Sequence, residues 1–266
     1  MVGQQTQLPL NPPPPVLRVI DDYGPVGKGV SQAHFVLAEN LQEYMVKGPS
    51  LVPTHPHVAA NEYVAARLAQ TIGLPILDFT VVELAGELCF ASAWMSRGTF
   101  YPETTEALFD RCENRDRLYD LVVFDAWIAN IDRHAGNLLV REVRPRGAEN
   151  PRRQLLCNDH SHCLIRPRER ANVLKSRLDA PPRDYISISF VINSITEAAR
   201  LTAALDRVGQ IQDGTIGAAI AEMPATFVPS APERALMQDY LLERRDRLAT
   251  IFRTHRATFP RLKGQL

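Results

Sequence analysis

The segment DAWIANIDRHAGNLLV, residues 125–140, decides how this sequence is interpreted. Apolar residues spaced three and four apart from residue 115 onward predict a helix that ends near Asn130, and the apolar run 138–140 predicts a strand. The polar residues between them therefore form a short loop between a helix and a strand. Asp132 and Asn137 both lie in this loop, in the pattern D-x-x-x-x-N. A rigid loop can direct both side chains toward one point.

An Asp and Asn presented together suit phosphoryl transfer. An acidic side chain must meet the attacking hydroxyl, and a nearby amide oxygen can hold Mg²⁺ against the phosphates of a nucleotide. Asp159 follows the apolar segment 155–157, where a second magnesium-binding carboxylate is expected. Because Mg²⁺ keeps phosphate and water among its ligands, one Asp and one Asn beside ATP are sufficient.

Two further charged residues occur upstream in the order that this chemistry requires. Lys47 ends the strand-like segment 43–47, and Glu62 lies in a predicted helix over residues 58–72. A strand lysine can reach nucleotide phosphates when a glutamate from a neighbouring helix holds it extended. Before them, the loop GKGVS with Gly27, Gly29 and Ser31 is suited to cover phosphates with its backbone N–H groups.

These motifs resemble those of HipA-like kinases. The sequence NIDRHAGN, preceded by a helix carrying Asp125, is similar to their catalytic loop and more distantly to that of phosphatidylinositol kinase relatives. The sequence NEYVAARLAQTIGLPI closely resembles a helix that HipA-like proteins carry. The similarity extends from about Gly24 to Leu164. It implies a bilobal, protein-kinase-like α+β fold that uses ATP and Mg²⁺.

The resemblance also implies roles for individual residues. Asp132 would be the catalytic base, and Asn137 and Asp159 would hold magnesium. Lys47 would contact the phosphates, and His134 would hold the loop in shape. Backbone groups at Ala93, Trp94 and Met95 would form the hinge that binds adenine.

The acceptor does not follow from these motifs. Family members phosphorylate serine or threonine in proteins, so a protein substrate is expected, and Ser31 resembles a position of autophosphorylation. A lipid or small-molecule kinase remains an alternative, as does a nucleotide-binding pseudokinase that acts as an interaction module. The chain is shorter than toxin-type members, and Asp159 is followed by His-Ser-His rather than Phe-Gly. A toxin role and an antitoxin partner are therefore not transferable.

Each residue also has a purely structural interpretation. Asp and Asn are common in turns and helix caps, so an isolated D-x-x-x-x-N pattern would indicate only a turn. Lys47 and Glu62 would separately be a strand-end charge and a surface charge. The functional interpretation is favoured because DRHAGN occurs together with the ordered partners on either side of it.

Composition narrows the class of protein. The 266 residues carry 30 basic and 30 acidic side chains, so no net charge favours nucleic acid as a main partner. The four cysteines form no C-x-x-C pair, which predicts free thiols in a reducing compartment. Neither a signal peptide nor an apolar run of membrane-spanning length is apparent, and a cytoplasmic location is expected. The oligomeric state is not predicted.

The pattern along the chain predicts two lobes. Residues 1–95 are strand-rich and would form an N-lobe with an antiparallel sheet, and residues 96–266 would form a helical C-lobe that carries the catalytic loop. Ala85-Gly86 indicates a hairpin. Two S-x-x-E capping boxes, at Ser194 and at Ser230, are predicted to begin C-terminal helices.

Overall fold

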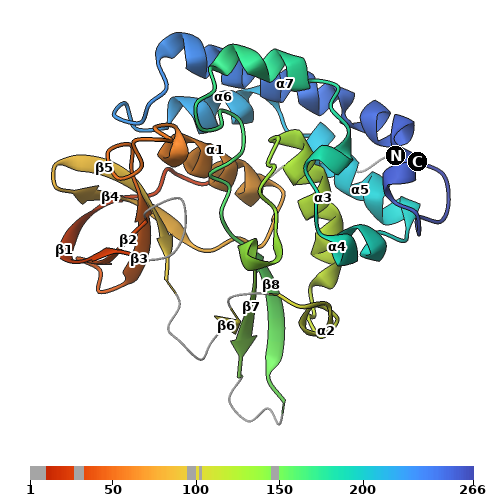
Figure 1. Ribbon diagram of the computed structural model, residues 1–266, viewed down its shortest axis with the longest axis horizontal. Coiled ribbons are helices and arrows are strands. Elements are labelled where there is room, and N and C mark those ends of the chain that lie inside the picture. The colour runs from red at the N-terminus through yellow and green to blue at the C-terminus, as the bar shows by residue number, and fades with distance from the viewer. Residues whose placement is uncertain (1–9, 27–32, 95–99, 102–103, 145–149) are drawn as a thin grey trace.

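A computed structural model describes residues 10–26, 33–94, 100–101, 104–144 and 150–266. The chain is a mixed α+β protein in which strands dominate the first part and helices the last (Figure 1). The strands are β1 Val16–Pro25, β2 His34–Ala38, β3 Glu43–Lys47, β4 Phe79–Leu84, β5 Glu87–Ala93, β6 Phe100–Tyr101, β7 Leu138–Val143 and β8 Arg152–Cys157. The α-helices are α1 Val58–Thr71, α2 Glu106–Phe109, α3 Leu118–Trp127, α4 Ser189–Ser194, α5 Ala198–Gly209, α6 Asp213–Ala221 and α7 Ala231–Thr254.

The first five strands close into a small barrel in the order β1-β2-β3-β5-β4. The hairpin prediction at Ala85-Gly86 is confirmed, because both residues have positive φ angles, 51° and 82°, between β4 and β5. The antiparallel sheet predicted for the first three strands is confirmed, because β1 pairs antiparallel with β2 and β2 with β3. In addition, β1 pairs in parallel with β4 through Val16↔Val81 and its neighbours. This pairing joins the two edges of the sheet and removes them from solvent.

The barrel interior is filled by small and β-branched side chains. Val36, Val46, Val82 and Ala91 are buried there, and in β2 and β3 the buried residues alternate with less buried ones. This alternation is the period-two pattern that a strand requires when one face is buried. The barrel therefore has its own apolar centre.

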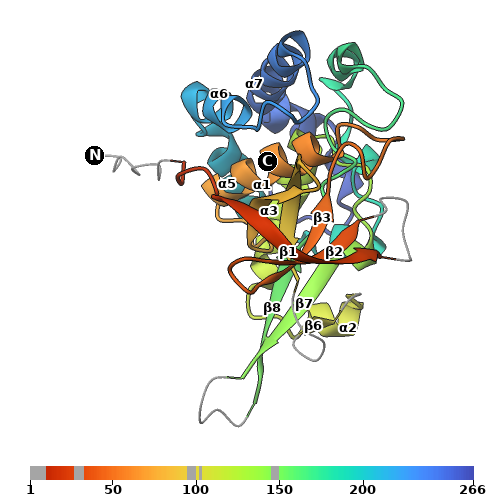
Figure 2. The same ribbon diagram turned by 90° about the vertical axis from the view of Figure 1, so that its left-hand side faces the viewer.

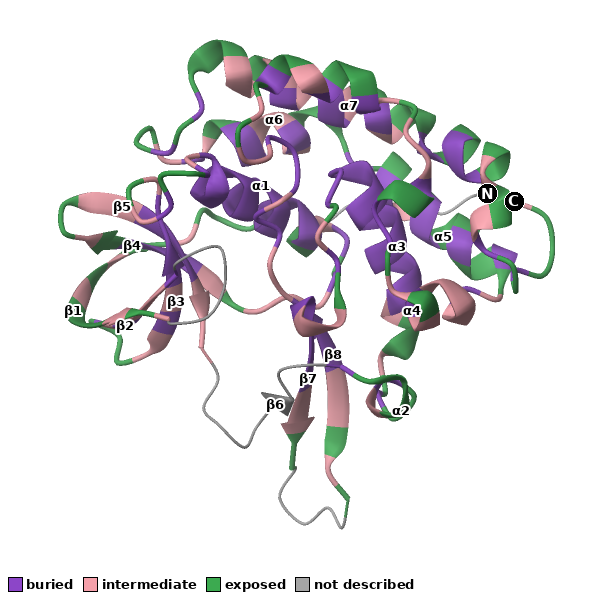
Figure 3. Ribbon diagram, viewed as in Figure 1, coloured by how far each residue is buried: buried purple, intermediate pink, exposed green. Residues whose placement is uncertain are grey.

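A second and larger core begins at α1 and continues into the C-terminal helices. Val64 and Leu68 of α1 pack in the same cluster as Phe90 of the barrel and Trp127 of α3. Figure 3 shows α1 and α3 as mostly buried elements between the barrel and the outer helices. Because this core includes residues on both sides of residue 95, the division into two lobes at that position stays a prediction.

Beyond the barrel, β6, β7 and β8 form a separate three-stranded sheet. Figure 2 shows that the β7–β8 hairpin extends away from the helices. Leu138 and Cys157 are paired at its base. The base of this hairpin lies directly after the Asp132 loop and directly before Asp159, so it brings the two segments together.

The two predicted capping boxes have different outcomes. The Ser230 box is confirmed, because the Ser230 N–H donates to the Glu233 carboxylate at 2.8 Å and α7 begins at Ala231. The Ser194 box is wrong, because Ser194 is the last residue of α4 and its hydroxyl donates to the Phe190 carbonyl. The four cysteines are free and buried. Within the part of the chain that is described, no helix combines the length and apolar character needed to cross a bilayer.

Candidate active site

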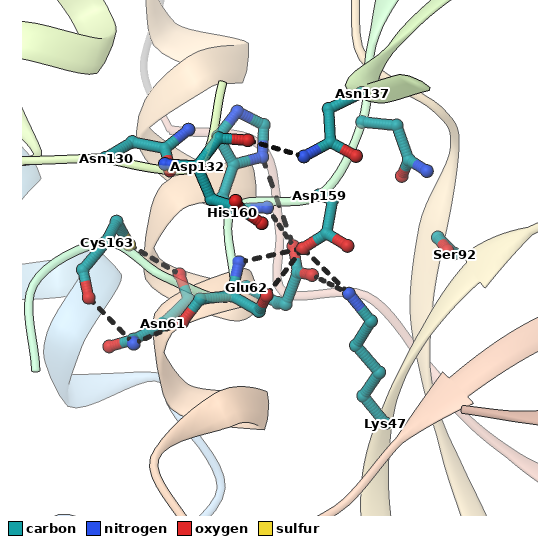
Figure 4. Close-up of polar contacts among 12 residues, drawn as sticks. Lys47, Asn61, Glu62, Ser92, Asn130, Asp132, Asn137, Asp159, His160 and Cys163 are labelled. Atoms are coloured by element: carbon teal, nitrogen blue, oxygen red, sulfur yellow. Dashed lines mark hydrogen bonds and ion pairs between the residues drawn. The ribbon is translucent and has the colours of Figure 1, made fainter. Parts of the chain in front are cut away.

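Lys47 joins the barrel to two carboxylates. Its Nζ lies 2.6 Å from Glu62 Oε1 and 2.9 Å from Asp159 Oδ1 (Figure 4). The predicted Lys47–Glu62 ion pair is therefore present. The lysine and Glu62 are almost completely buried, whereas 23% of the Asp159 side chain is exposed. Asp159 is thus the member of the trio that is accessible to a ligand.

The electrostatics follow from burial and pairing. Burial alone would lower the pKa of Lys47, but the charges of Asp159 and Glu62 outweigh it and raise the pKa above its ordinary value. Burial alone would raise the pKa of Asp159, and Lys47 together with hydrogen bonds from Ser161 lowers it well below its usual range. Burial raises the pKa of Glu62 by more than the charge of Lys47 lowers it, so its pKa lies above the ordinary value. Lys47 is a fixed positive charge and Asp159 a fixed negative one.

The geometry around Asp159 holds one carboxylate oxygen and leaves the other accessible. Oδ1 accepts the Ser161 N–H at 3.1 Å and the Ser161 hydroxyl at 2.6 Å, in addition to Lys47. Among the described residues, no hydrogen bond to Oδ2 is found. Asp159 has a φ of 57°, in the left-handed region that Asp tolerates better than most residues.

Glu62 has a second partner that sequence patterns did not indicate. Its Oε2 accepts the backbone N–H of His160 at 2.9 Å, so α1 binds both the strand lysine and the segment that follows β8. Asn61, the preceding residue, is fully buried, and its amide nitrogen lies 2.7–2.8 Å from the carbonyl oxygens of Ser161, Cys163 and Ile165. Asn61 and Glu62 of α1 therefore hold the backbone from His160 to Ile165.

The loop from 130 to 137 is anchored by a buried ion pair. Arg133 donates to both Asp125 oxygens, through Nε at 2.8 Å and through an Nη at 3.1 Å, and both side chains are 1% exposed. Arg133 also donates to the carbonyls of Asn137 and Asn158 at 2.9 and 2.6 Å. Although burial alone would lower it, the Asp125 charge raises the pKa of Arg133.

Arg133 was not assigned a role from the sequence, although it lies inside the DRHAGN motif. The available signal was the eight-residue spacing back to Asp125, which only a helix followed by a turn brings into contact. Since Arg133 also bonds to Asn158, it ties the loop from 130 to 137 to the residue before Asp159.

Asp132 and Asn137 occupy the positions that their motif predicts, at the ends of the loop. The Asn137 amide N–H₂ donates to the Asp132 carbonyl at 2.7 Å, and the side chain lies beside Asp159 in Figure 4. Within the described part of the chain, no hydrogen bond to its Oδ1 is found. The Asp132 side chain is 44% exposed and lies 4.0 Å from His134 Nε2. His134 Nδ1 accepts the Gly136 N–H at 3.1 Å, in agreement with the loop-shaping role predicted for this histidine.

The Asp159 carboxylate and the Asn137 amide oxygen fit a magnesium ion as a donor set, because Mg²⁺ takes hard oxygen ligands and few of them from protein. The described residues contain no cluster of three or more His, Cys, Asp or Glu that would form an all-protein metal cage. A magnesium site here would therefore depend on nucleotide phosphates for its remaining ligands.

The residues predicted to bind ATP are only partly described. Gly27, Gly29, Ser31 and Met95 lie outside the described residues. The strands that flank the glycine segment are paired, with Pro25 opposite His34.

The hinge N–H groups are already used within the barrel. Ala93 N–H donates to the Asp78 carbonyl at 2.7 Å and Trp94 N–H donates to the Glu43 carbonyl at 2.8 Å. The Trp94 carbonyl accepts a hydrogen bond from Gln42. A contact to adenine through those two N–H groups would have to displace these bonds, and the hinge formed by backbone groups at Ala93, Trp94 and Met95 stays a prediction.

Comparison with known proteins adds one family-model match. Residues 19–146 match the family model described as HipA-like kinase. The resemblance to HipA-like kinases is thereby confirmed. The matched segment includes Lys47, Glu62, Asp132 and Asn137 of the HipA-like pattern, whereas Asp159 lies beyond it. The place of Asp159 in the site therefore depends on the geometry described above.

Two solved structures are similar to this chain in fold or in part of it. The proinflammatory kinase CtkA of Helicobacter pylori is similar at a TM-score of 0.58 and 18% identity, over 86% of this chain and 94% of that one. A chain of the Shewanella oneidensis MR-1 toxin–antitoxin complex of HipA, HipB and operator DNA has a TM-score of 0.47 and 14% identity, over 89% of this chain and 68% of that one. At these identities the likeness to CtkA concerns the fold alone. No curated protein sequence matches the chain.

Proposed function

We propose that this chain is an ATP-dependent kinase that transfers the γ-phosphoryl group to a serine or threonine hydroxyl of a protein. The HipA-like family indicates a phosphotransferase. The observation that carries the proposal is the position of Lys47, whose ammonium contacts both Glu62 and Asp159. A buried lysine held by two carboxylates beside a D-x-x-x-x-N loop is an arrangement suited to phosphates and their counter-ions.

The proposed reaction assigns one task to each side chain. Asp132, exposed at the surface of the loop, orients the acceptor hydroxyl and accepts its proton as the new bond to the γ-phosphorus forms. The bond from the γ-phosphorus to the bridging oxygen breaks at the same time, and ADP leaves. Lys47 neutralises phosphate charge, and Glu62 keeps it extended. Mg²⁺ held by Asn137 and Asp159 would supply the further charge neutralisation that the transition state needs.

The rate would come from positioning and charge neutralisation, because the protein contributes no covalent step. Arg133 and Asn61 are positioning residues in this scheme, since they fix the loops and both side chains are buried. The predictions that nucleic acid is not a partner, that the location is cytoplasmic and that Ser31 is autophosphorylated remain untested.

ATP turnover by purified variants tests the proposal. We expect Asp132→Asn and Asp159→Asn to lower turnover by at least about 100-fold, with the fold retained in circular dichroism. Asp239→Asn, which changes an exposed aspartate of α7 in the same way, is the matched control and should keep full activity. Robust activity in both active-site variants would refute the assignment.

The acceptor and pseudokinase alternatives give different results in the same assay. Transfer of labelled phosphate to phosphatidylinositol or to a small polyol, without transfer to any protein, would replace the protein acceptor. Tight Mg-ATP binding by the wild type with no transfer, unchanged in Asp132→Asn, would identify a pseudokinase instead.

A further inference from the structure

A cavity of about 580 Å³ opens beside the Asp132 loop. Its walls come from three segments: the connection between β3 and α1, the catalytic loop, and the chain that follows β8. Ile131, the residue before Asp132, lines it with a 41% exposed side chain. This volume is in the range of ligand-binding sites. The cavity thus adjoins the residue proposed to orient the acceptor.

The segment after β8 gives the cavity a positive wall. Arg166 and Arg168 both line it, on either side of Pro167. Among the described residues, the Arg166 guanidinium has one hydrogen bond, to the Ala129 carbonyl at 3.4 Å, and its buried Nε has no partner. No ion pair of Arg168 is found in the same part of the chain.

The carboxylate in the cavity wall does not neutralise these arginines. Glu169 is paired with Arg177 and also accepts the backbone N–H of Arg166 at 3.3 Å. Burial and the charge of Arg177 lower the pKa of Arg166, and Glu169 offsets this only in part. A half-buried arginine that lacks a full counter-charge is costly, and an anion entering the cavity would supply that charge.

We infer that this cavity is the acceptor subsite and that it binds a protein segment carrying an aspartate or glutamate close to the phosphorylated hydroxyl. This inference rests on the proposed kinase function. The guanidinium groups match a carboxylate in charge and geometry. The apolar surface of Ile131 and Pro167 fits the aliphatic part of the same segment. His162 also lines the cavity, with its ring centroid 5.5 Å from that of His55.

Matched peptides test the inference. The probes are serine peptides that share one sequence except for a single aspartate, whose position is moved stepwise along either side of the serine. Each aspartate peptide is paired with a peptide that has asparagine at the same position. At the best position we expect wild type to phosphorylate the aspartate peptide with a kcat/KM about tenfold higher than the asparagine peptide. Arg166→Gln and Arg168→Gln should each reduce this ratio toward one. Arg170→Gln, an exposed arginine that does not line the cavity, should leave it unchanged.

Arg168 keeps the test independent of folding, because its side chain is exposed whereas Arg166 contributes to packing. Equal use of the aspartate and asparagine peptides by wild type would overturn the inference. So would a preference that both arginine variants retain.

Peptide binding separates this inference from the proposed reaction. Fluorescence anisotropy with the same labelled peptides measures the preference without catalysis. Preferential binding of aspartate peptides that is lost in Arg168→Gln, with no phosphate transfer, would support the subsite and count against the kinase reaction. Binding of phosphatidylinositol vesicles in place of the peptides would show that the cavity serves a lipid and would overturn the inference.

Discussion

Replacing Asp125 with asparagine tests whether the buried ion pair anchors the catalytic loop. In the native protein Asp125 accepts two hydrogen bonds from Arg133, and both side chains are 1% exposed. Asparagine keeps the shape but removes the charge and one acceptor. Arg133 would then be a buried cation without a counter-charge, which keeps its bonds to the Asn137 and Asn158 carbonyls and one bond at most to the new amide oxygen.

The expected loss of stability follows from the hydrogen bonds and the counter-charge that Arg133 loses. Each charge-assisted hydrogen bond contributes about 1.5–3 kcal/mol, and breaking a buried pair by removing one partner costs about 3–5 kcal/mol. We therefore expect Asp125→Asn to lower the free energy of unfolding by about 4 kcal/mol, a large part of the stability of an ordinary domain. Urea unfolding followed by tryptophan fluorescence measures this difference. Asp132→Asn, at an exposed position, should change the same free energy by less than about 0.5 kcal/mol.

A double-mutant cycle identifies the cause. Arg133→Met removes the cation, so Asp125→Asn should cost much less in that background, with a coupling energy of about 2–3 kcal/mol. If Asp125→Asn destabilises the protein by less than about 1 kcal/mol, or if the two changes are additive, the ion pair does not anchor the loop.

Three further results are expected. Glu62→Gln should lower kcat/KM by about 100-fold, because Lys47 loses the charge of the helix carboxylate that holds it. The control Glu243→Gln, at an exposed position of α7, should leave kcat/KM unchanged. A Glu62→Gln variant as active as the wild type would refute the role of Glu62. Asn61→Ala should lower the free energy of unfolding by about 2 kcal/mol, because buried carbonyls lose their donor, and should speed proteolysis after Ser161; thermal unfolding at the native midpoint would contradict this. Burial lowers the pKa of His55 to about 4, and its bond to the Ser161 carbonyl offsets this shift only in part. As the pH falls, His55 therefore takes up a proton in the unfolded chain before it does so in the folded protein. The free energy of unfolding should fall by about 3 kcal/mol between pH 6.5 and 4. The other charged groups that act on this ring are His57, His162 and Lys47. His55→Gln should remove that part of the pH dependence, and an unchanged slope would exclude it.

The sequence alone was sufficient for the parts of the site that depend on local patterns. Lys47 and Glu62 were assigned because a strand end and a helix face are visible in residue spacing, and their contact is present. Asp132 and Asn137 were placed by a motif short enough to form one loop. In both pairs, the two residues lie in one loop or in two consecutive secondary-structure elements, and this local structure sets the distance between them.

Contacts between segments far apart in the chain were not predictable in this way. The barrel closes because Val16 pairs with Val81, and no turn signal marks a parallel pairing across so many residues. The Ser194 capping box failed because Ser194 ends α4, and its hydroxyl bonds within that helix. Local capping patterns state which bonds are possible, and tertiary packing decides which of them form.

The adjacent residues Asn61 and Glu62 show how one helical turn connects these distant parts. Glu62 holds Lys47 of β3 with one oxygen and the His160 N–H with the other. Asn61 holds the carbonyls that follow, up to Ile165. A shift of α1 would therefore move the lysine and the Asp159 segment together, because the same turn binds both. The spacing between these two charges is fixed by side chains of a single helix, which explains why a site assembled from three distant segments can keep one geometry.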